Sequence, residues 1–94
     1  MFSKVPIDEK KIKGKNLQKE ALRIAIAAEF DAISLYEQLA DVVESKDIKD
    51  VLLDVAREEK THVGEFETLL LKYDDEQKEE SEKGKKEVEE IERA

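Results

Sequence analysis

Glu29, Glu59 and His62 are the residues of this chain whose types and spacing could perform chemistry. Each falls in a row of otherwise apolar residues that recurs at the three- and four-residue steps of one helix face. Burying a carboxylate without a partner costs several kcal/mol, roughly enough to cancel much of a small domain's stability, so such groups are usually paired, protonated or coordinated. Carboxylate and imidazole side chains together are good ligands for divalent metals. The pattern therefore predicts a metal site.

The spacing of Glu59 and His62 specifies how one helix can hold an ion. The first row contains Leu22, Ile26, Glu29, Ile33, Tyr36, Ala40 and Val43, and the second contains Leu52, Val55, Glu59, His62, Phe66, Leu69 and Tyr73. Side chains three residues apart on a helix point the same way, so Glu59 and His62 offer an oxygen and a nitrogen to one ion. Glu29 can close the site from the other helix.

Two long helices are predicted to position these residues. The first runs from Leu17 to about Val43, with Asn16 as its N-cap. The second runs from the break at residues 44–47 to about Tyr73, with Ser45 or Asp47 as its cap. So short a turn implies an antiparallel hairpin, which brings the middles of the two helices together.

The remaining segments flank this hairpin, giving three predicted regions. Residues 1–15 contain Pro6 and Gly14 and are interpreted as an N-terminal arm, residues 16–75 as the hairpin, and residues 76–94 as a charged C-terminal helix or tail. The apolar residues of that last segment, Val88, Ile91 and Ala94, recur at steps of three. Such a thin stripe suits a short helix docking on a neighbour, and a frayed tail is the alternative.

One hairpin supplies half of a dimetal site. A carboxylate-bridged di-iron centre in a four-helix bundle uses one Glu from each of two helices and a Glu-x-x-His pair from each of the other two. Glu29 provides one such Glu, and Glu59 with His62 provides one such pair. The sequence therefore predicts an all-α fold that dimerises into a four-helix bundle, with two metal ions at the homodimer interface.

Composition excludes several function classes. The 94 residues are 39% hydrophobic and 45% charged, with a net charge of -8, which is typical of a helical protein with solvated outer faces and disfavours nucleic acid or anionic membranes as partners. The chain contains no cysteine, which excludes disulfides, iron–sulfur clusters and thiolate metal sites. No signal peptide or membrane span is evident, so we expect a cytoplasmic protein.

Each candidate site residue, taken alone, also has a simpler interpretation. Because Glu is abundant, its position three residues before the one His could be chance, and a lone His in an apolar row is more often a hydrogen-bonded core residue. Tyr36, seven residues after Glu29, is by default a core aromatic and otherwise a redox neighbour of the metals. The three polar residues could also form a buried network that only fixes helix register in a non-enzymatic oligomerisation module.

Residues 29–36, EFDAISLY, and 52–66, LLDVAREEKTHVGEF, resemble the encapsulated ferritin family of the ferritin-like superfamily. The resemblance covers about residues 17–75. It implies two-helix chains with a short C-terminal helix, a di-iron dimer interface, a ring of ten subunits, and ferroxidase activity that feeds iron storage inside an encapsulin shell. The family's metal ligands correspond to Glu29, Glu59 and His62, and its nearby tyrosine corresponds to Tyr36.

The chain departs from the family pattern at two places. Members with a site at which iron enters carry a Trp before the tyrosine and extra acidic residues around the first Glu; here Leu35 and Ala28 stand at those positions and only Asp31 matches. The end, GKKEVEEIERA, matches no shell-docking peptide. The leading hypothesis is a ferroxidase that holds two iron ions per dimer, with manganese or zinc as substitutes, inside an encapsulin compartment. Rubrerythrin-like peroxide reduction is the alternative chemistry.

Overall fold

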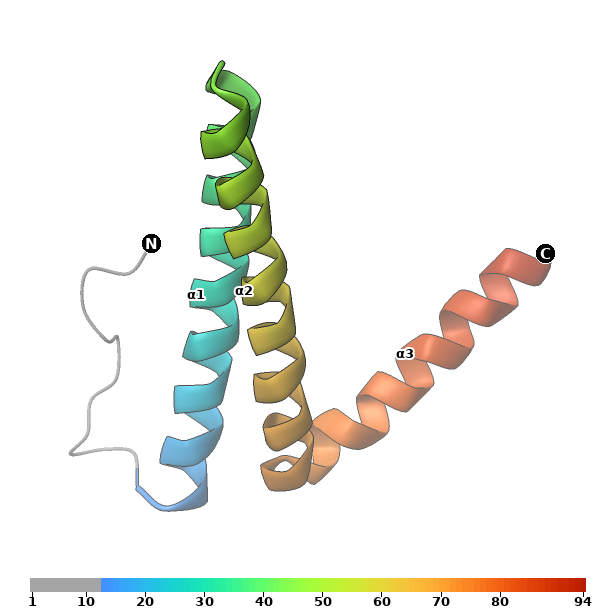
Figure 1. The fold of residues 1–94 in the computed structure, drawn as a ribbon. Coiled ribbons are helices and arrows are strands. Elements are labelled where there is room, and N and C mark those ends of the chain that lie inside the picture. Colours follow the sequence, from blue (N-terminus) through green and yellow to red (C-terminus); the bar gives the residue numbers. More distant parts are fainter. Residues whose placement is uncertain (1–12) are drawn as a thin grey trace.

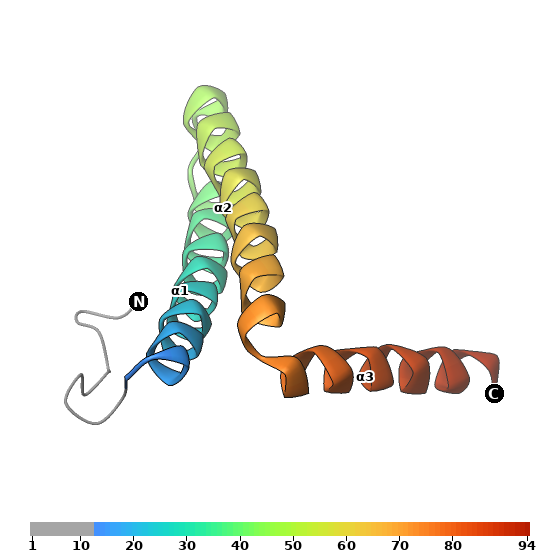
Figure 2. The same ribbon diagram turned by 90° about the horizontal axis from the view of Figure 1, so that it is seen from below.

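The computed structural model describes residues 13–94, which form three helices and no strand (Figure 1). The helices are α1 (Lys15–Val42), α2 (Lys46–Tyr73) and α3 (Asp75–Arg93). α1 and α2 lie side by side as an antiparallel hairpin, and α3 leaves the open end of that hairpin and points away from it (Figures 1 and 2). The all-α prediction is confirmed, and the predicted arm lies outside the described residues except for residues 13–15.

The start of α1 differs from the prediction. Gly14, not Asn16, is the N-cap residue, and its φ of 62° is a conformation that glycine adopts without steric cost. Its carbonyl accepts the first helical hydrogen bond, from the Gln18 N–H at 3.2 Å. Asn16 therefore lies inside the first turn, and the assignment of Asn16 as N-cap was wrong because glycine permits an earlier start.

The second helix begins at a turn stabilised by two polar side chains. Ser45 is the N-cap residue, as predicted, but its hydroxyl donates to the Asp47 carboxylate rather than accepting from the helix backbone. Asp47 Oδ1 also accepts from the Ile48 N–H at 2.9 Å. These two bonds, that of Ser45 foremost, lower the pKa of Asp47 below its ordinary value. An ionised Asp47 in the first turn favours the helix through its dipole.

The interior of the hairpin is made by small and medium apolar residues. The buried ones are Ala32, Ile33, Ala40, Ala56, Val63 and Leu70. On α2 the buried residues Ala56, Val63 and Leu70 are seven residues apart. Each directly follows a residue of the predicted row, namely Val55, His62 or Leu69. The predicted row of α2 is itself at most partly covered, since each helix of a single hairpin has one long neighbour, and it lies at the edge of the α1–α2 contact. On α1, Ile33 and Ala40 of the predicted row are buried.

Several large apolar side chains stay exposed on the single chain. Phe30 and Leu35 are 51% and 44% exposed, so neither belongs to the core of the single chain. The others of this kind are Leu39, Val42, Ile48, Val51, Leu53, Leu69, Tyr73, Val88 and Ile91. A chain of this size buries a modest core alone, and this much apolar surface is typical of a chain that associates.

The C-terminal segment forms the predicted third helix, not a tail. Asp74 caps α3, and its Oδ1 accepts from the Gln77 N–H at 3.0 Å. Gly84 lies inside the helix without ending it. Val88 and Ile91 are 55% and 74% exposed, so the thin apolar stripe is not buried against the rest of residues 13–94. No helix among residues 13–94 is long and apolar enough to cross a membrane.

Gly64→Ala is expected to raise the stability of the hairpin. Gly64 is inside α2, and an added Cβ would meet no atom within 4 Å. Alanine has less backbone freedom to lose than glycine, so we expect a gain of about 1 kcal/mol in the free energy of unfolding. Urea denaturation followed by circular dichroism measures it. A loss of stability would show that an unseen neighbour packs against this position.

The contribution of Asp74 to stability is expected to disappear in acid. The Gln77 N–H, the charge of Lys19 and the Arg23 guanidinium together hold the pKa of Asp74 below its ordinary 3.8. A carboxyl with a depressed folded-state pKa stabilises the fold above its unfolded-state pKa, and loses that effect as the pH falls through the folded value. Asp74→Asn should therefore be less stable than the parent at pH 7, with a difference that shrinks below about pH 4. A difference that is the same at pH 3 and pH 7 would contradict this.

Candidate metal centre

The hairpin brings Glu29, Glu59 and His62 to the same depth. Glu29 lies at the middle of α1, and Glu59 and His62 lie at the middle of α2. Because the helices have equal lengths of 28 residues and run antiparallel from one turn, their midpoints face each other. The three side chains thus converge because the turn position and the helix lengths place the middles of α1 and α2 opposite each other, as the sequence predicted.

The three side chains form a single cluster of possible ligand atoms. One ligand atom from each of Glu29, Glu59 and His62 lies within 4.8 Å of the other two. His62 Nδ1 is 3.5 Å from Glu29 Oε2 across the helix pair and 3.5 Å from Glu59 Oε2 on its own helix. Among the described residues this is the one group of three or more such side chains that could hold a metal. Neither 3.5 Å contact is a short hydrogen bond, and an ion between the three atoms would give each of them a closer partner.

Burial makes the Glu29 carboxylate the critical member of the cluster. Its side chain is 18% exposed, that of Glu59 is 20% exposed, and that of His62 is 44% exposed. Glu29 Oε2 is fully covered and accepts no hydrogen bond. A buried carboxylate oxygen without a donor is costly, and a cation satisfies it. The donor set, two carboxylates and one imidazole, fits iron or another divalent metal of intermediate softness.

The cluster remains open on the side away from the hairpin contact. Three ligand atoms are fewer than iron binds, and His62 keeps nearly half of its side chain exposed. Further ligands must come from water, from substrate or from another chain. Val51 and Leu69, which precede and follow Glu59 and His62 on α2, are exposed, and exposed apolar side chains suit contact with a protein neighbour.

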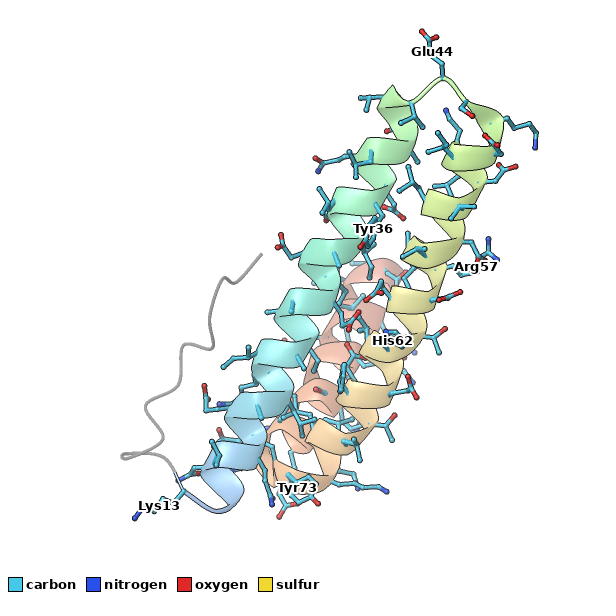
Figure 3. All side chains as sticks on the ribbon, turned by 60° about the vertical axis from the view of Figure 1, so that its left-hand side comes forward. Lys13, Tyr36, Glu44, Arg57, His62 and Tyr73 are labelled. Carbon is cyan, nitrogen blue, oxygen red and sulfur yellow. The ribbon has the colours of Figure 1, made fainter. Side chains whose placement is uncertain are left out.

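Tyr36 lies on the same face of α1 as Glu29 but outside the cluster. Figure 3 shows Tyr36 and His62 in the strip between α1 and α2, with Arg57 on the outer side of α2. Within residues 13–94 the Tyr36 hydroxyl has no hydrogen-bond partner, so the expectation of a bonded core tyrosine is not met in the single chain. Asp31 and Glu58 are exposed and lie outside the cluster.

A cross-helix ion pair flanks the centre. Lys60, next to Glu59, places its ammonium 2.9 Å from Glu37 of α1. The pair lies on the exposed side of the hairpin, so its contribution to stability is small. Lys60 is the cation nearest to Glu59 in the sequence. Because Lys60 pairs with Glu37, it does not neutralise the ligand carboxylates.

Comparison with known proteins identifies the family of the chain. Residues 20–93 match the Rubrerythrin family. A crystal structure of the encapsulated ferritin domain from Pyrococcus furiosus superposes with a TM-score of 0.83 and 48% identity, over 97% of this chain and 93% of that one. This chain belongs to the encapsulated ferritins. The encapsulated-ferritin resemblance seen in residues 29–36 and 52–66 is confirmed, and the ferritin-like fold with it.

Two curated relatives of this encapsulated ferritin are named as proteins of encapsulin compartments. A ferritin-like–encapsulin shell fusion protein of Pyrococcus furiosus is 57% identical over 72 residues, which are 77% of this chain and 21% of that protein. The encapsulin nanocompartment cargo protein EncC of Myxococcus xanthus is 39% identical over 57 residues, which are 61% of this chain and 44% of that protein. The chain thus spans between about a fifth and under half of the length of these relatives.

One polar contact of this encapsulated ferritin was missed by the sequence analysis. Arg23 of α1 and Asp74 at the α2–α3 junction form an ion pair of 2.7 Å across 51 residues of sequence. The one available signal was weak: Arg23 is the one charged residue in the otherwise small or apolar stretch 21–28, and Asp74 directly follows the apolar row that ends at Tyr73. Neither feature indicated the other residue as its partner.

Proposed function

We propose that the chain is a ferroxidase, oxidising Fe(II) to Fe(III) with dioxygen at a centre that a second copy completes. The observation that carries this proposal is Glu29 Oε2, a covered carboxylate oxygen without a hydrogen-bond donor that faces Glu59 and His62 from the opposite helix. Ferritin-like and rubrerythrin relatives are often iron oxidoreductases, and the fold match supports the same class of chemistry here.

The proposed centre needs two chains. Two copies related by a two-fold axis bring together two Glu29, two Glu59 and two His62 side chains, which is the complete ligand set of a carboxylate-bridged dimetal site in a four-helix bundle. In this arrangement Glu59 bridges the two ions, Glu29 is a terminal or second bridging ligand, and His62 is a terminal nitrogen ligand. The exposed apolar side chains beside the cluster become the dimer interface.

The reaction uses iron as substrate. Each of two Fe(II) ions gives up one electron, and dioxygen takes up both electrons. The four carboxylates contributed by Glu29 and Glu59 of two chains place negative charge around the site, which favours the higher charge of Fe(III). Tyr36, on the same face of α1 as Glu29, is proposed as a redox neighbour of the centre. Manganese or zinc can occupy the same ligands without this chemistry.

The proposed function takes place inside a protein compartment. The relatives named above are a shell fusion protein and an encapsulin cargo protein, and we propose that this chain likewise works inside an encapsulin shell that stores the Fe(III). The same resemblance supports a ring of ten subunits as the assembled form. α3, with Val88 and Ile91 exposed, is free to contact further copies.

Anaerobic binding of Fe(II) tests the proposed site. Equilibrium dialysis should show saturation at one Fe(II) per chain, because each chain contributes one half of a two-iron centre. Glu29→Ala should abolish this binding, whereas Glu58→Ala, which removes an exposed carboxylate next to Glu59, should leave it unchanged. Equal binding by the two variants would refute the assignment of the ligands.

Peroxide reduction is the second candidate, and the match to the Rubrerythrin family over residues 20–93 favours it. These 94 residues contain no cysteine for a thiolate-bound electron-transfer centre, so the electrons would have to come from a donor outside them. Single-turnover oxidation of the Fe(II)-loaded protein distinguishes the two reactions. The ferroxidase reading predicts fast oxidation by dioxygen, whereas fast oxidation by hydrogen peroxide together with slow oxidation by dioxygen supports the alternative.

A further inference from the structure

The junction between α2 and α3 is tied to α1 by one buried carboxylate. Asp74, the residue between the two helices, is 4% exposed. Its Oδ2 lies 2.7 Å from Arg23 Nη2 of α1, and its Oδ1 accepts from the Gln77 N–H of α3 at 3.0 Å. Its own N–H donates to the Leu70 carbonyl of α2 at 2.9 Å. A single residue therefore connects all three helices.

The guanidinium of Arg23 is itself held in place. Its Nη1 donates to Glu20 Oε1 at 2.7 Å, while Nη2 donates to Asp74. Two carboxylates, one on α1 and one at the junction, thus restrict the rotation of a side chain that is otherwise half exposed. Removal of Arg23 would leave the Asp74 carboxylate covered and without its hydrogen-bonded cation, with only the charge of Lys19 nearby, an arrangement that favours movement of the junction.

Little else fixes the direction of α3. Among the described residues α3 packs against α2 near the junction and makes no packing contact with α1. The rest of α3 extends away from the hairpin (Figures 1 and 2). The inner angle of the junction holds a cavity of about 410 Å³, lined by Ile26, Glu67, Leu70, Leu71, Gln77 and Ser81. This space shows that the inner angle of the junction is not tightly packed.

From these contacts we propose that the Arg23–Asp74 pair is a lock that fixes the direction of α3 relative to the α1–α2 hairpin. Because α3 packs only against α2 among the described residues, the pair sets its direction by anchoring the junction residue to α1. The lock is separate from Glu29, Glu59 and His62 and acts whether or not a metal is bound. It makes Arg23 and Asp74 positioning residues for α3 and for whatever surface α3 presents.

A distance measurement within one chain tests the lock. The absence of cysteine allows two spin labels to be placed at Gln38→Cys on α1 and Lys86→Cys on α3, both exposed positions, with excess unlabelled chain present to suppress distances between copies. Pulsed electron paramagnetic resonance should give one narrow distance in the parent. Arg23→Gln should broaden or shift that distance. Arg57→Gln, which removes an arginine paired with Asp54 inside α2, should not change it.

If Arg23→Gln perturbs the hairpin, Asp74→Asn provides a second way to remove the Arg23–Asp74 ion pair. Asparagine can still accept the Gln77 N–H as an N-cap, so α3 stays helical while the charge pair is lost. The double variant should be no broader than either single variant, because both remove the same interaction. If both single variants keep the parental narrow distance with parental helix content by circular dichroism, the lock is disproved.

Discussion

Replacing Glu29, Glu59 or His62 with alanine is expected to lower the initial rate of Fe(II) oxidation by more than about 100-fold. Loss of a group that merely supports a metal ligand already costs about 10- to 100-fold in affinity or activity, and loss of a ligand should cost more. By two-fold symmetry, each substitution removes two ligands from the proposed dimer centre. The rate is measured by ferric absorbance after mixing the metal-free protein with Fe(II) in air.

Glu58→Ala is the matched control for these variants. Glu58 precedes Glu59 on α2 but is exposed and outside the cluster, so its loss changes the net charge without removing a ligand. We expect a rate close to that of the parent. Oxidation at the parental rate in all three ligand variants would contradict the proposed centre. An equal loss in Glu58→Ala would show that the total acidic charge, rather than these ligands, carries the reaction.

Metal binding is expected to stabilise the dimer strongly. A ligand present at 100 times its dissociation constant adds about 2.7 kcal/mol to the stability of the state that binds it, which for a chain of this size raises the melting temperature by roughly 10 to 20 °C. Because the centre is shared, the gain should appear together with a shift from monomer to dimer. Thermal unfolding and sedimentation with and without Zn(II), which occupies such ligands without being oxidised, measure both effects.

His62→Ala separates this stabilisation from non-specific ion binding. The variant lacks the one imidazole of the chain, so Zn(II) should neither raise its melting temperature nor promote its dimerisation. A dimer that forms equally well with a chelator present, and that gains no stability from metal, would favour the reading in which Glu29, Glu59 and His62 only fix the register of a helical oligomer.

The helices and their pairing were predictable because the information is local. Apolar residues at helical spacing, the break at residues 44–47 and the position of Glu29 and Glu59 near the middles of the two helices were enough to bring the ligands together. The start of α1 was not predicted, since the sequence pattern favours Asn16 as a cap whereas the backbone uses the positive φ of Gly14.

The structural features that could not be predicted depend on residues that are distant in the sequence or on neighbours outside the chain. The α2 row that holds Glu59 and His62 was expected at the centre of a core, yet in one hairpin it is at most partly buried, because each long helix has one long neighbour. Phe30 and Leu35 are exposed on the same single hairpin. The Arg23–Asp74 pair joins residues whose proximity follows from the return of α2, and no local pattern indicates it.

The measurement that tests the central claim most directly is stopped-flow ferric absorbance at one, two, three and four Fe(II) per dimer, on the parent and on His62→Ala. The shared centre predicts a fast phase whose amplitude grows up to two Fe(II) per dimer and then stays constant, because each dimer holds two ions. The fast phase should be absent in His62→Ala. Slow oxidation that is identical in both proteins, or a fast amplitude that grows without saturation, would contradict an iron-oxidising centre built from Glu29, Glu59 and His62 of two chains.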